Sequence, residues 1–372
     1  MIYKNLLTIV AALGILTSAV CINEANATEN KPVIKIGATL PLTGDSAEAG
    51  LAAKAGLEIV LDDLQKNNLR YDYQLVFEDN QLSSPKVYSS VNKMINADKV
   101  KALLSFWNLS GNVVSSVADK EGVFSLTCSI GEESTKGRYN FNNYVSNPRE
   151  AKAMVETLKK HGVKTVALIT DNSGMRQQYE VVKDYMAKNS DIKVVFEEFF
   201  NPGETDYKAA IIKASEKKPD MYLYSGYNPS IYIFMKQLKE ITGKNDNVTT
   251  IDMFFDMAPK DRDIVEGLWY VDSNLNGTPE FQKRLLDEKG VVSQSCTGNV
   301  AGNLQIIVAA YENAELKEGE TIPSNEAVRQ WIFDNIHDYE TVGGAVTVVR
   351  EGLFDKAPSI KKMVNREAVI AE

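Results

Sequence analysis

Short strand-like segments alternate with amphipathic helical segments along most of the chain, and this alternation is the strongest constraint on its fold. Strand-like segments occur at 33–38, 73–77, 100–104, 123–127, 165–169, 192–196 and 219–224. Between them, apolar residues recur at helical spacing; Leu57, Val60 and Leu64, for example, lie on one helix face. Mostly apolar strands separated by such helices are typical of parallel sheets covered on both faces. The sequence therefore predicts a doubly wound α/β protein.

The first 27 residues have the pattern of a cleaved secretion signal. Lys4 precedes an apolar run from 6 to 20, and the small residues at 25 and 27 fit a cleavage site. We therefore expect an exported, periplasmic protein. No later apolar run is long enough to predict a membrane span. The formal net charge of −9 argues against nucleic-acid binding, because an acidic surface repels phosphate backbones.

Two cysteines, Cys128 and Cys296, follow the predicted leader. Export permits a disulfide between them. They lie far apart in the sequence, however, and spacing alone cannot pair them. We expect free, buried thiols, with Cys128 acting as a small apolar filler.

The strand–helix units are too many for one modest sheet. The link at 144–148, which contains Pro148, separates two series of units. Two doubly wound lobes that face each other fit this pattern. In such sheets ligands bind beyond the carboxyl ends of the strands, so the predicted site is a cleft between the lobes.

Several segments resemble type I periplasmic binding proteins of the Leu/Ile/Val-binding class, the solute receptors of branched-chain-amino-acid ABC transporters. Residues 36–44 (IGATLPLTG) resemble the opening strand and loop of that family, and 75–80 (LVFEDN) resemble its second strand. Residues 219–229 (PDMYLYSGYNP) resemble the strand and aromatic loop of its second lobe, and 266–268 (EGL) resemble the return to the hinge. Together the resemblance spans residue 33 to about residue 354.

The connectivity of that family implies three crossings of the chain between the lobes. Lobe one would comprise 28–146 and 273–345, and lobe two would comprise 147–272 and 346–372. The crossings would act as hinges, and closure of the lobes would trap the solute.

Two loops of the first lobe are candidates for holding a ligand carboxylate. Asn108 and Ser110 lie between a strand and a helix expected to open near residue 112, and helix N-terminal amides suit an anion. A plain helix cap by either side chain is the alternative. The resemblance implies that this loop supplies hydroxyl and backbone donors, and that Ser129 and Gly131 occupy contact positions in the next loop. Trp107, together with Tyr227 and Phe255 of the second lobe, suggests an apolar or aromatic ligand body.

The candidates of the second lobe also follow its strands. Tyr227 matches the family's aromatic contact, whereas Met175 stands where the family usually has an aromatic residue. Arg176 either binds a second acidic group of the ligand or lies in solvent. In amino-acid receptors a carboxylate near Phe255 and Asp256 binds the ligand's ammonium. Asp256 in the cleft would favour an amino acid, and Phe255 a ligand without a charged amine; paired aromatics are otherwise typical of core packing.

The chain lacks the sequence marks of an enzyme. His161 and His337 have no spaced partners, and neither a nucleophile elbow nor a phosphate-binding glycine loop is present. We expect no cofactor and no metal.

The resemblance implies a monomeric protein that delivers a small carboxylate-bearing metabolite to a membrane ABC permease. The metabolite is an amino acid or a related organic or aromatic acid, and these alternatives stay open. The same fold also serves as a soluble ligand sensor that presents itself to a membrane signalling partner.

Overall fold

The computed structural model describes residues 31–130, 133–172, 174–350 and 352–371. The predicted secretion signal and Gly131 lie outside the described residues. Among the helices of the described residues, none combines the length and the hydrophobicity that crossing a membrane requires.

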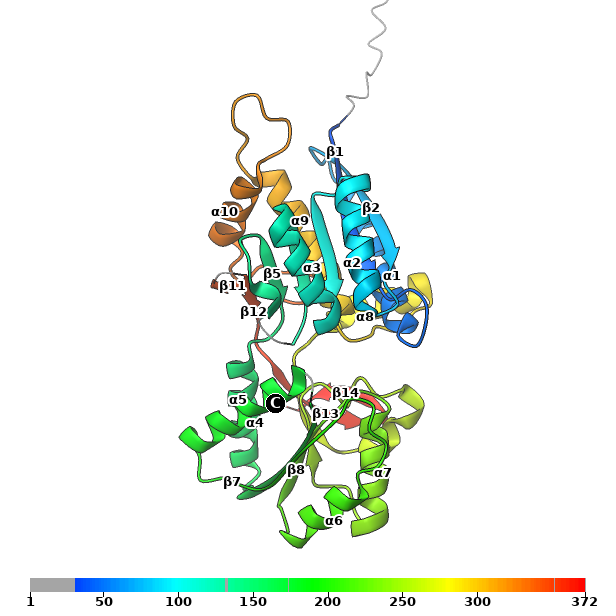
Figure 1. The fold of residues 1–372 in the computed structure, drawn as a ribbon, viewed down its shortest axis with the longest axis vertical. Helices are drawn as coiled ribbons and strands as arrows, with labels where there is room; N and C mark the ends of the chain where they lie inside the picture. The colour runs from blue at the N-terminus through cyan, green and yellow to red at the C-terminus, as the bar shows by residue number, and fades with distance from the viewer. Residues whose placement is uncertain (1–30, 131–132, 173, 351, 372) are drawn as a thin grey trace, which may run out of the picture. The chain divides into compact units, whose positions relative to one another are not determined.

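The first lobe is built on a seven-stranded sheet in the order β11-β12-β5-β4-β3-β1-β2 (Figure 1). All neighbouring pairs are parallel except β11 and β12. Every residue of β3 and β4 is buried, as expected for central parallel strands with helices on both faces. The strands are β1 (Val33–Leu40), β2 (Asp72–Asp79), β3 (Ala102–Phe106), β4 (Phe124–Cys128), β5 (Asn140–Asn143), β11 (Thr347–Arg350) and β12 (Leu353–Asp355).

Helices from two distant parts of the chain cover this sheet. One face packs against α2 and α3, in a cluster that includes Val87, Leu103 and Val114. The other face packs against α1 and α9, through residues such as Leu57 and Leu304. The helices of this lobe are α1 (Ala47–Leu64), α2 (Ser84–Lys93), α3 (Asn108–Glu121), α8 (Pro279–Lys289), α9 (Thr297–Asn313) and α10 (Asn325–Asn335).

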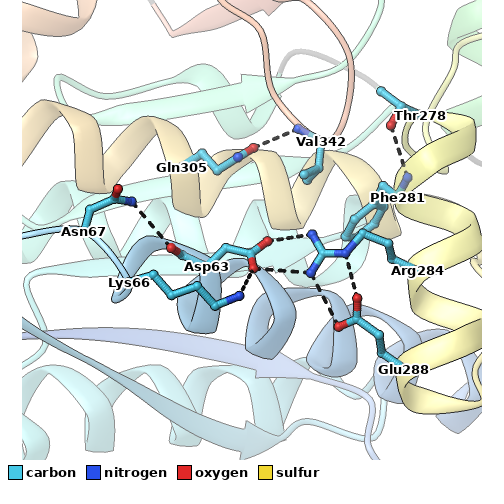
Figure 2. Close-up of polar contacts among 9 residues, drawn as sticks. All are labelled: Asp63, Lys66, Asn67, Thr278, Phe281, Arg284, Glu288, Gln305 and Val342. Carbon is cyan, nitrogen blue, oxygen red and sulfur yellow. Dashed lines mark hydrogen bonds and ion pairs between the residues drawn. The ribbon is translucent and has the colours of Figure 1, made fainter.

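Polar contacts also fix the late helices to the early ones (Figure 2). The guanidinium of Arg284 in α8 binds the carboxylate of Asp63 in α1, with Nη1 and Oδ2 2.6 Å apart. This hydrogen bond lowers the pKa of Asp63. The amide of Val342 donates to the side-chain oxygen of Gln305 in α9 at 2.7 Å. The segment after residue 273 therefore returns to the first lobe.

The second lobe has a four-stranded parallel sheet in the order β7-β6-β8-β9 and a three-stranded antiparallel sheet in the order β10-β13-β14. A parallel bridge between Ile251 and Val271 joins the two sheets. The elements are α4 (Asn147–Lys160), β6 (Thr165–Asp171), α5 (Gly174–Asn189), β7 (Lys193–Phe200), α6 (Lys208–Glu216), β8 (Met221–Ser225), α7 (Ser230–Thr242), β9 (Val248–Thr249), β10 (Trp269–Asp272), β13 (Ser359–Val364) and β14 (Glu367–Ile370).

The chain passes between these sheets after β5, after β10 and after β12. The predicted last boundary, between residues 345 and 346, is wrong. β11 and β12 belong to the first sheet, because β12 pairs with β5 and the ring of Phe354 stacks on Phe141 with centroids 5.2 Å apart. The final crossing therefore follows Asp355.

Cys128 and Cys296 form a disulfide, so the expectation of free thiols is also wrong. Cys128 ends β4, and Cys296 precedes the first residue of α9. Asn303 of α9 donates to the carbonyl of Thr127, which holds the helix against the strand end. The two cysteine Cα atoms consequently lie 5.8 Å apart despite a sequence separation of 168.

Candidate functional site

A pocket lies at the carboxyl ends of the strands, where residues of both lobes meet. It encloses about 370 Å³ of atom-free space, part of which is open to solvent. The lining residues are Trp107, Asn108, Cys128, Ile130, Tyr144, Tyr227, Asp252, Met253, Asp256, Leu275, Ser295 and Cys296. Its position agrees with the cleft that the sequence predicts.

Three of the lining residues have a positive φ angle without being glycine. The angles are 63° at Trp107, 64° at Asp252 and 69° at Cys296. Such backbone conformations cost free energy and are concentrated at ligand-binding and catalytic sites. Backbone strain therefore gathers in the wall of this pocket.

The N-terminus of α3 faces the pocket at Asn108, the first residue of the helix. The amides of a first helical turn have no intrahelical acceptor, and the helix dipole makes this end electropositive. α9 also begins at the pocket, but the amides of Thr297 and Gly298 already donate to loop carbonyls. α3 is therefore the better-placed helix end for a ligand anion.

The two predicted hydroxyl donors of the first lobe do not line the pocket. The Ser129 hydroxyl donates to the side-chain oxygen of Asn108 at 2.8 Å, and its amide donates to Asn142 at 3.0 Å. Ser110 is buried and accepts a hydrogen bond from Asn80 at 3.3 Å. Ser129 therefore orients Asn108, and the predicted direct contacts from Ser129 and Ser110 do not agree with this geometry.

Met175 and Arg176 of the second lobe also lie away from the pocket. Met175 is fully buried in the core, where the Ser225 hydroxyl contacts its sulfur at 2.9 Å. The Arg176 guanidinium lies over the ring of Phe199, 4.3 Å from its centroid, and bonds the side chain of Asn172. Of the two alternatives for Arg176, the structure shows the exposed one.

The loop after β9 presents Asp256 to the pocket, while Phe255 packs against Arg262. The Arg262 guanidinium carbon lies 4.5 Å from the Phe255 ring centroid, and Phe255 lines a smaller adjoining pocket together with Asp256. Tyr227 lines the main pocket from the loop after β8, and 39 % of its surface is exposed. Between the two alternatives for the ammonium position, the geometry favours Asp256.

The electrostatics of the pocket favour a cationic group. Burial raises the pKa of Asp256 to about 8, and the nearby carboxylates of Asp252 and Asp272 add to this rise, while Arg262 opposes it. The pKa of Asp252 is raised to about 6, mainly by burial. Among the described lining residues, the ones with charged side chains are both acidic. A positive ligand group would restore the ionised form of Asp256.

Arg262 holds the loop that carries Asp256. Its Nε donates to the carbonyl of Met257 at 3.0 Å, and its Nη2 donates to the carbonyl of Phe255 at 2.5 Å. Both neighbours of Asp256 are thereby anchored. Burial lowers the pKa of this guanidinium, which is consistent with its position between backbone carbonyls.

Several lining residues were not predicted from the sequence. Asp252 and Met253 lie shortly before the predicted residues Phe255 and Asp256, and the rule that sites follow strand ends could have found them. Tyr144 lies in the predicted link, but nothing in its sequence context indicates a site. The remaining lining residues that sequence reasoning missed are Ile130, Leu275, Ser295 and the disulfide pair.

Comparison with known proteins identifies the family. The periplasmic binding protein family model matches residues 33–353, so the chain belongs to that family. The chain is 26 % identical, over 223 residues, to the leucine-, isoleucine-, valine-, threonine- and alanine-binding protein of Pseudomonas aeruginosa. That match covers 56 % of this chain and 57 % of the relative, so the chain spans little more than half the length of that relative.

Solved structures confirm the fold. A branched-chain amino acid transporter substrate-binding protein from Streptococcus pneumoniae, in complex with isoleucine, superposes with a TM-score of 0.76 at 18 % identity, covering 90 % of this chain and 97 % of that one. A solute-binding protein of an ABC transporter from R. palustris, in complex with benzoate, has a TM-score of 0.76 at 14 % identity, covering 91 % and 95 %. The family model confirms the predicted periplasmic binding protein family, and these structures confirm the predicted type I fold.

Proposed function

We propose that this protein is the periplasmic solute-binding component of an ABC importer and that its ligand is a zwitterionic α-amino acid. The main observation behind this proposal is that the pocket offers one position for an anionic group and another for a cationic group. The N-terminus of α3 at Asn108 suits a carboxylate, and Asp256 suits an ammonium group. An α-amino acid bears both groups on one carbon.

The rest of the pocket favours an apolar ligand side chain. Ile130, Met253 and Leu275 line it together with the disulfide and the ring of Trp107. Burial of an apolar side chain against such a wall contributes about 1.5–3 kcal/mol. The relative from Pseudomonas aeruginosa, named for binding leucine, isoleucine, valine, threonine and alanine, supports this ligand class.

An aromatic acid is the second candidate ligand. Trp107, Tyr144 and Tyr227 give the pocket three aromatic side chains, and a protein of the same fold is known in complex with benzoate. Benzoate has no ammonium group, so it would leave Asp256 without a cationic partner. This difference separates the two candidates experimentally.

Calorimetry with four probes tests the proposal. L-Leucine is compared with 4-methylpentanoate, which lacks the amine, with 3-methylbutylamine, which lacks the carboxylate, and with benzoate. We expect L-leucine to bind more tightly than either truncated analogue, and to stabilise the fold by about 2.7 kcal/mol at a concentration of one hundred times Kd. Tighter binding of benzoate than of L-leucine would refute the amino-acid assignment.

A variant pair sharpens this test. Asp256→Asn should weaken binding of L-leucine at least tenfold while leaving benzoate binding within about twofold, because only the amino acid pairs with the carboxylate. Asp246→Asn is the matched control, since Asp246 is an exposed acid of the same lobe. Delivery to a permease is tested separately, by ligand uptake into vesicles that contain the permease, and a signalling response without uptake would favour the sensor alternative.

A further inference from the structure

Two buried carboxyl groups share one hydroxyl at the place where the chain crosses between the lobes. Glu150 lies in the first turn of α4, Ser273 directly follows β10, and Asp252 lines the ligand pocket. All three residues are buried, and Glu150 is fully inaccessible. The Ser273 Oγ lies 2.6 Å from Oε1 of Glu150 and 2.9 Å from Oδ2 of Asp252.

Counting hydrogens fixes the protonation of this cluster. The Ser273 hydroxyl has one hydrogen, and it can therefore donate to only one of the two carboxyl oxygens. The second contact is a hydrogen bond only if the other carboxyl group carries a proton and donates it to Oγ. Two ionised carboxylates at these distances would leave one oxygen–oxygen contact without a hydrogen, in a buried site where such a contact is costly.

The donors around each group decide which carboxyl holds the proton. Asp252 accepts from the Tyr144 hydroxyl at 2.7 Å and from the Ser273 amide at 2.6 Å, besides the Ser273 hydroxyl. Apart from Ser273, Glu150 accepts from Gln178 at 2.7 Å, and this bond goes to its other oxygen. Three donors stabilise an ionised Asp252, so the proton belongs on Oε1 of Glu150.

The charges that face Glu150 support the same assignment. Burial raises the pKa of Glu150 well above its ordinary value, and the carboxylates of Asp252 and Asp355 add to this rise, while the hydrogen-bonding contacts with Ser273 and Gln178 oppose it. Arg149 forms an ion pair with Asp355 at 3.2 Å, which offsets part of that contribution. The other titratable groups near Glu150 are the hydroxyls of Tyr144 and Tyr179, whose pKa values are also raised by burial.

Three further charged residues lie near the cluster: Asp272, Lys361 and Lys356. Asp272 lies near Asp252 and forms an ion pair with Lys361 at 3.2 Å. Lys356, at the last crossing, is buried and donates to the carbonyls of Asn274 and Gly343. Burial lowers the pKa of Lys356 to about 7. Neither Lys356 nor Lys361 forms a direct ion pair with Glu150 among the contacts of the described residues.

We propose that Glu150 is a protonated positioning residue of the ligand pocket, which donates to Ser273 so that the Ser273 hydroxyl can orient the ionised Asp252. The predicted effect on ligand affinity rests on the proposed function, because it assumes that the pocket binds an amino acid. The proton itself is a property of the folded chain without ligand. The two parts are therefore tested by different measurements.

Glu150→Gln reproduces the protonated side chain at every pH. Its amide group donates to Ser273 while its carbonyl accepts from Gln178, so the variant should fold. The wild type folds with a proton that the unfolded chain releases above a pH of about 4.3, the ordinary pKa of a glutamate. Its unfolding constant should therefore rise, relative to that of Glu150→Gln, by up to tenfold per pH unit between pH 5 and pH 7.

Urea unfolding of the full chain at several pH values measures this difference. Glu156→Gln is the matched control, because Glu156 is an exposed residue of the same helix. Its pH profile should run parallel to that of the wild type. If the profile of Glu150→Gln also runs parallel to that of the wild type, the proposal is overturned.

A measurement on the wild type keeps the test independent of any variant. In protein labelled with ¹³C at the glutamate carboxyl carbon, one resonance should keep the chemical shift of a protonated acid at pH 7. Ionisation of every glutamate at pH 7 would refute the proposal.

Calorimetry with L-leucine then tests the positioning role. Glu150→Gln should retain the wild-type affinity within about twofold at pH 7, where Asp252 is ionised, while Ser273→Ala should lose at least tenfold. A Ser273→Ala variant that binds as tightly as the wild type would remove the positioning role. Absence of L-leucine binding by the wild type, with the protonated resonance present, would refute the proposed ligand and leave the protonation of Glu150 established.

Discussion

Replacing Cys128 and Cys296 by serine should remove a large part of the stability of this protein. The disulfide joins residues with a separation of 168 in the sequence, so the unfolded chain regains the freedom of a very long loop when the bond is absent. The loop-entropy relation for that length gives about 17 cal/mol/K, or about 5 kcal/mol at 25 °C. Since measured effects are often smaller than this limit, we expect a loss of about 3–5 kcal/mol.

Urea unfolding of the wild type and of Cys128→Ser/Cys296→Ser measures this loss. Peptide mapping without reductant checks the bond itself, because the peptides containing the two residues should be recovered as one linked species. A variant within about 1 kcal/mol of the wild type, despite a confirmed bond in the latter, would contradict the loop-entropy reasoning. Recovery of unlinked peptides with free thiols would contradict the disulfide.

The same substitution should also weaken ligand binding. Both cysteines line the pocket, and the carbonyl of Cys128 accepts a hydrogen bond from the amide of Trp107 at 2.7 Å. The disulfide therefore helps to fix the segment that leads into α3. We expect calorimetry to show an affinity for L-leucine at least about tenfold lower in the double variant, about 1.4 kcal/mol.

Three further predictions concern the pocket. Affinity for L-leucine should rise by up to about tenfold per pH unit from pH 6 to pH 8. The ligand's ammonium group requires an ionised Asp256, and the pKa of Asp256 in the free protein is about 8. Calorimetry on Asp256→Asn should show no such rise. Gly174→Ala should weaken binding of L-leucine with little change in the urea midpoint. The added Cβ would lie 1.9 Å from Nδ2 of Asn108, across the cleft. An unchanged affinity would show that the lobes need not approach this closely. Arg262→Met should lower stability by about 1–3 kcal/mol in urea unfolding, because it leaves the carbonyls of Phe255 and Met257 without their donor, and an unchanged midpoint would contradict that role.

Up to about residue 225, the sequence alone determined the kind and order of most of the secondary structure, whereas β5 and the strands after β8 were not predicted. The run predicted at 123–127 is β4 at Phe124–Cys128, and the run predicted at 219–224 is β8 at Met221–Ser225. Such patterns are local, because periodicity records which side of each element is buried. The predicted start of α3 was inaccurate, because the helix opens at Asn108 and not near residue 112. Trp107 explains this difference, since its positive φ turns the chain directly from strand to helix.

Parts of the candidate site also followed from the sequence. Trp107 and Asn108 were predicted from their places after a strand, Tyr227 and Asp256 also from the family resemblance, and all four line the pocket. The carboxyl ends of parallel strands meet at one edge, so position along the chain is enough to bring such residues together. Whether each side chain points into the pocket was not determined in this way.

Only the tertiary structure decided the orientations and the distant pairings. Ser129 follows its strand as predicted, yet its hydroxyl donates to Asn108 and does not line the pocket. Met175 is buried in the core. The pairing of Cys128 with Cys296 depends on the return of α9 to the first lobe. Local periodicity shows which residues are buried, but which buried groups meet depends on the packing of segments far apart in the chain.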